Sequence, residues 1–269
     1  MDFNSRVLNI AKNNLDNETS NASFLLNDTL RLLAKWRMEL IRNTFLQHGN
    51  TIVASGPLAG LDFLEMSAEG CHIPKLIGCY EQPLSPYIKA AIDTKYSTVI
   101  HIGCAEGYYA VGMTKKMPAT KSFAFDINDK AQNICRDLAR KNNVEDRIKI
   151  DGNFKIEEFS NFNQGNILVF CDIEGGEYEL LDPNKAPNLR QMDIIVELHN
   201  IVATNGLDLL INRFKDSHTV TVVEDDGQRD LKGVVAPWFK SLSHLDQLIT
   251  VWEMRSEPTP WLVMKVKKL

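Results

Sequence analysis

The sequence predicts an α/β fold in which a doubly wound, mostly parallel sheet follows an N-terminal helical extension. From residue 86 onwards, short runs of apolar and β-branched residues alternate with stretches of helical periodicity. Strands that alternate with helices pair in parallel through right-handed crossovers, and the helices then cover both faces of the sheet. We therefore predict a helical extension or cap over residues 1–85 and a sheet domain over residues 86–269.

The N-terminal part contains one strong helical pattern. Residues 1–20 are polar and rich in Asn, and we expect them to be poorly ordered. From Phe24 to Phe45, apolar residues recur near helical spacing and predict an amphipathic helix. Its stripe either packs on the rest of the protein or binds a partner, including a second copy in a homodimer. The stripe consists of Leu26, Leu30, Leu33, Trp36, Leu40 and Ile41.

Seven short apolar segments of the sheet domain are predicted to be strands. Each is rich in Val, Ile, Phe or Thr, and polar or helical segments separate it from the next. The predicted strands are Thr98–Ile102, Ser122–Asp126, Ile148–Asp151, Ile167–Cys171, Asp193–Leu198, Thr219–Glu224 and Leu262–Val266.

Three helices of this domain carry clear sequence signals. Pro86–Asp93 begins with Ser85 at the expected N-cap and a proline at the first helical position. From Ala131, apolar residues at i, i+3, i+4, i+7 and i+8 predict the face of a second helix. Ser243, with an aspartate three residues on, predicts a capped helix over Ser243–Glu253. Its expected apolar stripe is Leu245, Leu248, Ile249 and Trp252.

Composition excludes several classes of protein. The 269 residues include 30 Lys and Arg against 35 Asp and Glu, and a net charge of −5 disfavours nucleic-acid binding. No apolar run approaches the roughly 18–20 residues of a membrane span, and the polar start is not a signal peptide. We therefore expect no membrane contact and a cytoplasmic location. The five cysteines form no C-x-x-C pair, so neither a disulfide framework nor a zinc knuckle is expected.

The loop after the first predicted strand reads Gly103-Cys-Ala-Glu-Gly107. Glycines let a backbone turn sharply and approach a ligand closely. The spacing G-x-x-x-G differs from the G-x-G-x-x-G of dinucleotide-binding folds, and no P-loop motif is present. Taken alone, the loop is equally compatible with a simple reversal of the chain.

Aspartates at two further strand ends point to a nucleoside. Asp126 ends the second predicted strand, nineteen positions after Gly107, where a carboxylate can accept hydrogen bonds from both hydroxyls of a ribose. Asp151 ends the third predicted strand and can meet the exocyclic amine of an adenine. The alternative is that Asp126 caps the following helix, although Asn128 can do so equally well.

The fourth predicted strand ends in an acidic segment, Cys171-Asp172-Ile-Glu174-Gly-Gly-Glu177. Three carboxylates this close repel one another unless cations or amides compensate, so such clusters are often functional. The alternative is an acidic helix N-terminus. On the fifth strand, Glu197 and His199 share a face and lie roughly 7 Å apart at Cα, so both can point into one cleft.

Taken together, these motifs resemble those of class I S-adenosylmethionine-dependent methyltransferases, and within that class the FkbM-type family. The resemblance covers about residues 74–200, with a plausible tail that starts at Pro260. It is carried by the segments PKLIGCYE (74–81), VIHIGCAEGYY (99–109), FD (125–126), CDIEGGE (171–177) and VELH (196–199).

The resemblance implies a Rossmann-like, seven-stranded sheet whose last strand is inserted antiparallel, and O-methylation of a small molecule or saccharide. It places Gly103, Cys104 and Gly107 along the methionine part of the cofactor. Asp126 would hold the ribose and Asp151 would face the adenine. Tyr80 and Glu81 would close over the cofactor's polar end.

One position departs from the family pattern. His101 stands where the family usually has an acid that helps to anchor the amino-acid end of the cofactor. Glu106 is the candidate to supply the missing carboxylate. This departure leaves open a non-catalytic or degenerate cofactor-binding protein, and Asp126 alone would also suit an NAD-type oxidoreductase.

For the chemistry, we predict His199 as a general base that Glu197 orients, with Asp172 positioning the acceptor. Asp172, Glu174 and His199 are also oxygen and nitrogen ligands in one neighbourhood, so a divalent metal is compatible with the site. No fixed ligand spacing requires one, and none is predicted. The segment 227–260 is expected near the strand ends, as a lid, as an acceptor wall or as scaffold.

Overall fold

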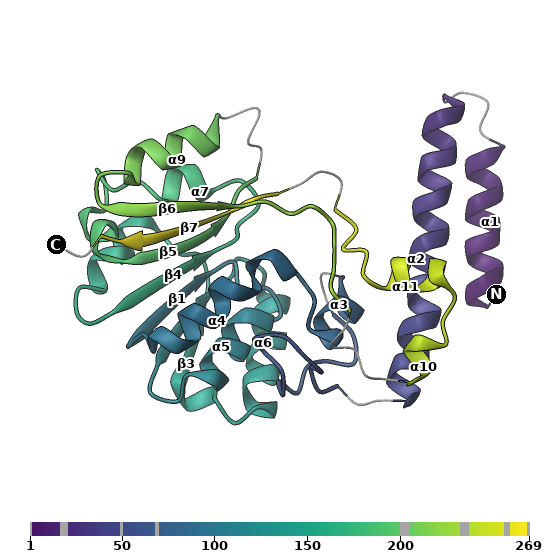
Figure 1. Cartoon of the computed structure of the whole chain (residues 1–269), viewed down its shortest axis with the longest axis horizontal. Helices are drawn as coiled ribbons and strands as arrows, with labels where there is room; N and C mark the ends of the chain where they lie inside the picture. Colours follow the sequence, from purple (N-terminus) through teal and green to yellow (C-terminus); the bar gives the residue numbers. More distant parts are fainter. Residues whose placement is uncertain are drawn as a thin grey trace.

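A computed structural model describes residues 2–16, 21–48, 51–67, 70–199, 205–231, 237–255 and 259–267. At its centre is a seven-stranded sheet with the order β3-β2-β1-β4-β5-β7-β6 (Figure 1). Strands β1 to β5 run parallel, whereas β7 is antiparallel to both of its neighbours. The predicted Rossmann-like, doubly wound sheet with an inserted antiparallel last strand is therefore confirmed. The strands are β1 (Thr98–Ile102), β2 (Lys121–Phe125), β3 (Ile148–Asp151), β4 (Ile167–Cys171), β5 (Asp193–Glu197), β6 (His218–Val223) and β7 (Trp261–Val266).

The register of the sheet aligns the ends of its central strands. Ile102, the last residue of β1, pairs with Phe125 on one side and with Cys171 on the other. The residues that follow these strands therefore emerge side by side at one edge. This edge is where a doubly wound sheet binds its ligands, because the loops separate there.

Helices cover both faces of the sheet, and each face has its own hydrophobic core (Figure 1). One face is covered by α4 (Ser85–Thr94), α5 (Tyr108–Lys116) and α6 (Asp129–Lys141). The other is covered by α7 (Glu177–Leu180), α9 (Gly206–Phe214) and two short 3-10 helices, η3 (Ile156–Asn161) and η4 (Pro187–Gln191). The remaining elements are α1 (Phe3–Leu15), α2 (Ala22–His48), α3 (His72–Ile77), η1 (Gln82–Leu84), η2 (Glu145–Arg147), α10 (Pro237–Lys240) and α11 (His244–Thr250).

The expected helix caps have different outcomes. The sequence left both Asp126 and Asn128 open as the cap of α6, and the cap is Asn128, because its side chain accepts hydrogen bonds from the N–H groups of Lys130 and Ala131. The prediction for α4 is wrong: Ser85 lies within the helix, and Leu84 holds the N-cap position without a side-chain bond.

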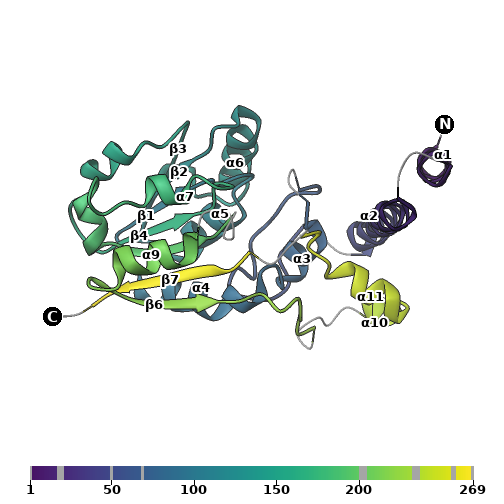
Figure 2. The ribbon, with the colours of Figure 1, turned by 90° about the horizontal axis from the view of Figure 1, so that it is seen from above.

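The N-terminal extension is a helical hairpin that stands beside the sheet domain (Figures 1 and 2). The expectation that residues 1–20 are poorly ordered is wrong for α1, which Asp2 caps by accepting a hydrogen bond from Ser5 N–H; residues 17–20 lie outside the described part of the chain. The predicted helix over 24–45 is confirmed as α2. Residues 53–84, which the prediction assigned to the extension, instead contribute side chains such as Phe63 and Leu76 to the core of the sheet domain.

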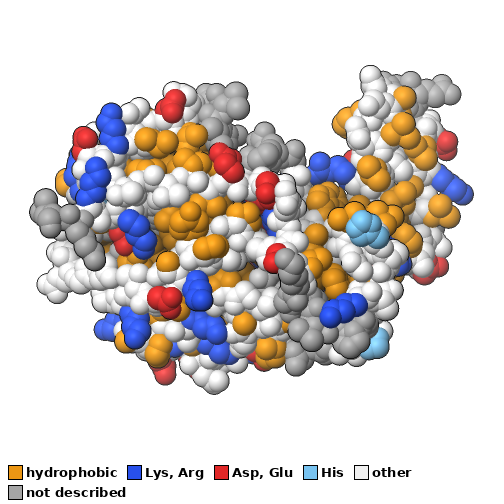
Figure 3. Space-filling view, in the orientation of Figure 1, with side chains coloured by type: hydrophobic (Ala, Val, Ile, Leu, Met, Phe, Trp, Pro, Cys, Tyr) orange, Lys and Arg blue, Asp and Glu red, His pale blue; other side chains and the backbone are white. Residues whose placement is uncertain are grey.

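Two predicted apolar stripes are exposed rather than packed. On α2, Ile41 is buried, but Leu26 and Leu30 are 62% and 66% exposed. On α11, Leu245 and Leu248 point to solvent because the helix turns its Asp246 face towards α2. There Asp246 accepts two hydrogen bonds from Arg37, at 2.6 and 2.7 Å. Figure 3 shows hydrophobic side chains gathered over the hairpin and around α11. No helix among the described residues is long and apolar enough to cross a membrane.

We predict that Gly107→Ala destabilises the fold by about 2 kcal/mol, whereas Gly152→Ala changes stability by less than about 0.5 kcal/mol. Gly107 has φ of 95°, and a Cβ there would lie 2.7 Å from Cys135 Sγ, between α5 and α6. At Gly152 a Cβ would meet nothing within 4 Å. Urea unfolding measures both values. Equal stability of the two variants would contradict this account of the packing of α5 on α6.

Candidate active site

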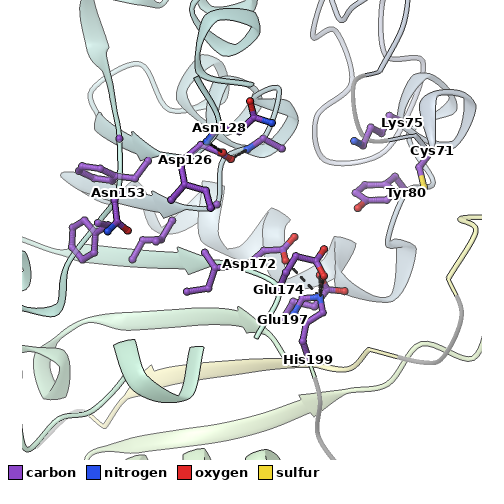
Figure 4. A pocket seen from close by; sticks show the side chains of 18 of the residues that line it. Cys71, Lys75, Tyr80, Asp126, Asn128, Asn153, Asp172, Glu174, Glu197 and His199 are labelled. Atoms are coloured by element: carbon purple, nitrogen blue, oxygen red, sulfur yellow. Dashed lines mark hydrogen bonds and ion pairs between the residues drawn. The ribbon is translucent and has the colours of Figure 1, made fainter. Parts of the chain in front are cut away.

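A cavity of about 740 Å³ opens at the carboxyl ends of β1, β2, β4 and β5. Residues that follow these strands form one wall, including Gly103, Asp126 and Asp172. The opposite wall comes from segments that the sheet does not contain, namely Cys71, Lys75 and Tyr80 around α3, and Glu253 and Arg255 after α11. Figure 4 shows the two walls facing each other across the cavity. The segment 227–260 therefore contributes to this wall through its last described residues.

The loop after β1 is held against the loop after β4. Gly103 has φ of 80°, and a Cβ at this position would lie 1.6 Å from the carbonyl oxygen of Asp172. Only glycine allows this approach. The two loops consequently form one continuous floor that runs from the β1–β2 side of the cavity to the β4–β5 side.

Asp126 is fixed at the β2 edge by backbone donors. Its Oδ2 accepts a hydrogen bond from Ala105 N–H at 2.8 Å, and its Oδ1 accepts one from Asn128 N–H at 2.8 Å. The side chain of Asn128, and not that of Asp126, caps α6. The alternative that Asp126 is the cap of α6 is therefore wrong. Each carboxylate oxygen keeps a second lone pair for a ligand in the cavity.

The β2–β3 end of the cavity is mostly apolar. Phe125, Ile127 and Phe154 line it, and Ile127 is 83% exposed although it is a large apolar residue. An exposed isoleucine next to a buried aromatic pair suits a flat, partly apolar ligand such as a purine. Asn153 lines this end as well and offers both an amide donor and a carbonyl acceptor.

Five of the predicted cofactor residues do not line the cavity: Glu81, which is described below, Cys104, Glu106, Gly107 and Asp151. Asp151 contacts Lys149 at 3.2 Å and does not line the cavity, whereas Asn153, two residues on, does. Gly107 packs against Cys135, and Cys104 is a buried thiol whose hydrogen bond with Cys135 and burial raise its pKa. Glu106 is completely buried.

Glu106 and Lys75 form a buried ion pair with Nζ 2.5 Å from Oε1. Burial works against the charged carboxylate, but Lys75 and a 2.6 Å hydrogen bond from Ser67 together lower the pKa of Glu106. Its carboxylate thus holds the lysine that lines the cavity and does not itself reach the cavity. The expectation that Glu106 supplies an anchoring carboxylate is not met by this geometry.

His101 does not reach the cavity either. It is 1% exposed, its ring packs 5.7 Å from that of Phe170, and burial lowers its pKa to about 3. Neither ring nitrogen has a hydrogen-bond partner among the described residues. At neutral pH this histidine is an uncharged part of the core, so it cannot replace an anchoring acid by charge.

Arg255 organises the carboxylates on the far wall. It forms ion pairs with Glu81 and Glu197, which come from the segment before α4 and from the end of β5. Glu81 also accepts a hydrogen bond from Tyr109 Oη at 2.7 Å. Burial and the charge of Glu197 nevertheless raise the pKa of Glu81, although Arg255 and Tyr109 work against this shift. Glu81 is thus a buried partner of Arg255, while its neighbour Tyr80 faces the cavity.

His199 lies at the centre of an acidic cluster (Figure 4). Its Nδ1 is 2.9 Å from Oε1 of Glu177, a side chain with no solvent exposure. Its Nε2 faces three further carboxylates at distances beyond hydrogen bonding. These distances are 3.9 Å to Asp172, 3.4 Å to Glu174 and 3.6 Å to Glu197.

The predicted pairing of His199 with Glu197 is therefore only partly right. Both residues point into the same part of the cavity, but Glu177 holds the imidazole ring through Nδ1. Glu177 Oε1 is in turn held by the N–H groups of Ile173 and Gly175, at 3.3 and 3.1 Å. Glu197 is instead committed to Arg255.

The surrounding charges alter two pKa values in this cluster. Burial alone would lower the pKa of His199, but the hydrogen bond to Glu177 and the charges of Glu197 and Glu174 raise it above its usual value. Burial and the charge of Glu197 raise the pKa of Asp172 far above the usual range of an aspartate. Asp172 and His199 thus keep their protons up to a higher pH than the same side chains would in water.

Sequence reasoning missed Lys75, Asn153, Glu177 and Arg255 as parts of the site. Glu177 belongs to the acidic motif found in the sequence, but the sequence did not indicate that its partner is His199. Lys75 and Arg255 are distant in sequence from the strand ends, and no local pattern indicates that they reach the cavity.

No family model matches this chain, and no curated protein matches it. Several solved structures share part of its fold. The O-methyltransferase TomG from Streptomyces achromogenes in complex with SAM is 12% identical, with a TM-score of 0.45 over 68% of this chain and 81% of that one. The O-methyltransferase from Bacillus cereus in complex with SAH is 12% identical, with a TM-score of 0.45 over 70% and 81%. Cofactor-bound Rv0187 from MTB is 15% identical, with a TM-score of 0.45 over 69% and 79%.

We predict that Glu177→Gln lowers the pKa of His199, because the substitution removes a charged acceptor from Nδ1. The Cε1–H shift of His199, followed by NMR against pH in chelator-treated protein, measures the change. The pKa of His199 is raised in the folded state, so its protonated form stabilises the fold. This stabilisation is complete below the pKa that His199 has in the unfolded chain, and it is lost as the pH rises through the folded-state pKa. Glu179→Gln, on the exposed side of α7, is the control and should leave the titration unchanged. An unchanged pKa in Glu177→Gln would rule out this assignment.

Proposed function

We propose that this chain is an S-adenosylmethionine-dependent methyltransferase that transfers a methyl group to a hydroxyl oxygen of a small molecule or saccharide. One observation carries the proposal: a single cavity joins the backbone-held carboxylate of Asp126 to the acidic cluster around His199. The carboxylate of Asp126 suits a ribose, and the acidic cluster suits a cationic sulfur centre next to an acceptor.

The residues of the cavity suit the parts of S-adenosylmethionine in order. Phe125, Ile127, Phe154 and Asn153 offer an apolar and amide-bearing surface for the adenine, and Asp126 offers lone pairs to the ribose hydroxyls. The Gly103 loop leaves room for the chain that carries the sulfur. Lys75, Tyr80 and Arg255 lie where the amino-acid end would reach, and the positive charges of Lys75 and Arg255 suit its carboxylate.

When bound, S-adenosylmethionine supplies a methyl group on a positively charged sulfur. The acceptor oxygen would form a bond to the methyl carbon as the carbon–sulfur bond breaks, and the electron pair of the broken bond would stay on sulfur. The carboxylates of Glu174 and Glu197 provide a negative environment for that positive charge. In the metal-free protein, the neutral form of His199 takes the acceptor's proton at Nε2, and Glu177 holds the ring in position through Nδ1. Asp172 orients the acceptor hydroxyl.

Three finer assignments belong to the same proposal. The motifs that begin at Pro74 and end at His199 support an FkbM-type subfamily. Five unpaired, buried cysteines favour a reducing compartment, which supports a cytoplasmic location.

We also propose a homodimer through α2, since Leu26, Leu30 and Leu33 recur at i, i+4 and i+7 and are all exposed. Sedimentation of Leu30→Asp beside the native protein tests the dimer, and the proposal fails if both sediment as monomers.

We predict that the protein binds S-adenosylhomocysteine in isothermal calorimetry and gives no heat with NAD. Asp126→Ala should weaken this binding roughly 10- to 100-fold, because charge-assisted hydrogen bonds contribute about 1.5–3 kcal/mol. Asp129→Ala removes an exposed carboxylate at the start of α6 and should retain the native affinity. The absence of heat with S-adenosylhomocysteine, or equal heat with NAD, would overturn the proposed cofactor.

We predict that His199→Ala lowers turnover roughly 10²- to 10⁴-fold at saturating cofactor, which is the usual contribution of a general base. Methyl transfer from labelled S-adenosylmethionine to a panel of saccharide and small hydroxyl acceptors provides the assay, and Asp172→Asn is measured alongside. His244→Ala, at the exposed start of α11, is the control. Normal turnover in both site variants would refute the catalytic assignments. Cofactor binding without transfer to any acceptor would favour a non-catalytic protein.

A further inference from the structure

We infer that Asp172, Glu174 and His199 form a binding site for a divalent transition-metal cation in the same cavity. The sequence alone did not predict a metal, because the three residues follow no fixed ligand spacing. The role of the cation in catalysis rests on the proposed function, whereas the existence of the site does not.

The three side chains present suitable ligand atoms at one point. One atom from each residue, the imidazole Nε2 and two carboxylate oxygens, lies within 4.8 Å of the other two. The distances of 3.4 and 3.9 Å from Nε2 to these oxygens are too long for hydrogen bonds. Ligand atoms that share a cation are roughly 3 Å apart, given bonds of about 2.1 Å. Movements of less than about 1 Å would therefore bring the three atoms onto one ion.

Two further observations indicate that a cation belongs here. The Oδ1 atom of Asp172 is buried and has no hydrogen-bond partner among the described residues. The side chain of Glu197 is only 4% exposed and directs Oε2 at the same Nε2 atom from 3.6 Å. A buried carboxylate oxygen without a donor, such as Oδ1 of Asp172, is costly, and a bound cation satisfies it directly.

Glu177 prepares His199 to act as a ligand. It accepts the hydrogen bond from Nδ1, so the lone pair of the neutral ring is on Nε2, which faces the carboxylates. Two backbone N–H groups hold this glutamate in place, and its side chain is fully buried. A histidine whose second nitrogen donates to a buried carboxylate is the usual arrangement around protein metal ions.

The composition of the site limits which cation it suits. One imidazole and two carboxylates favour Mn²⁺, Zn²⁺ or Fe²⁺ over Ca²⁺, which takes oxygen ligands. Three protein ligands leave coordination positions open, as in catalytic and not structural metal sites. Glu174 is 86% exposed, so it can move towards the ion without disturbing the core.

A cation here changes how an acceptor would be activated. A hydroxyl oxygen that binds an open position loses its proton more readily, because the positive charge stabilises the alkoxide. His199 then acts as a ligand, and the proton leaves to solvent or to a neighbouring carboxylate. Methyl transfer by this form of the protein would depend on the metal and would be lost on chelation.

Metal binding to the full chain tests the inference directly. After dialysis against a chelator, Mn²⁺ is titrated and followed by electron paramagnetic resonance, and Zn²⁺ by calorimetry. We expect one ion per chain, at least tenfold weaker binding in Glu174→Gln, and loss of binding in His199→Ala. The matched control Glu179→Gln removes another exposed carboxylate nearby and should bind as the native protein does.

The outcomes separate this inference from the proposed function. No saturable binding of either ion at millimolar concentration, or binding that Glu174→Gln and His199→Ala leave unchanged, overturns the metal site. S-adenosylhomocysteine binding is measured on the same metal-free protein. If that ligand binds and the metals do not, only the metal site fails. If the metals bind with the expected variant pattern and S-adenosylhomocysteine does not, the metal site stands and the proposed cofactor fails.

Discussion

The contact between the loops that follow β1 and β4 determines the shape of the site. Gly103 lies so close to the backbone of Asp172 that no side chain fits between them. This contact is possible because β1 and β4 are neighbours in register, with Ile102 opposite Cys171. It places a loop suited to the chain of a cofactor directly beside the acidic cluster. A ligand held at Asp126 must therefore extend over this floor towards His199.

The second constraint is an excess of negative charge in a partly buried space. Arg255 compensates Glu81 and Glu197, and Lys75 compensates Glu106, so these five charged groups neutralise one another locally. Around His199, however, Glu177 is the carboxylate nearest to the ring among the described residues, at 2.9 Å, and the others lie at 3.4 Å or more. Asp172 and Glu174 stay available for a positively charged group. A sulfonium and a divalent cation both meet this requirement, and the acceptor would lie between them.

The segments outside the sheet complete the cavity and connect it to the helical extension. Cys71, Lys75 and Tyr80 come from the chain before α4, and Arg255 comes from the chain after α11. The bidentate pair between Arg37 and Asp246 ties α11 to α2. The position of α2 and the far wall of the cavity are thereby linked through one short stretch of chain. These additions form one wall of the cavity, and the strand ends of the sheet form the other.

The sequence by itself determined the alternation of strands and helices, the glycine loop, and the strand-end positions of Asp126, Asp172 and His199. These are local properties: periodicity defines the elements, and parallel strands bring their carboxyl ends to one edge. It did not determine that Glu177 holds His199, that Glu106 pairs with Lys75, or that Asn153 replaces Asp151 at the cavity. Those partners depend on where loops distant in sequence meet, and only the tertiary structure fixes which side chain faces the cavity and which is buried behind it.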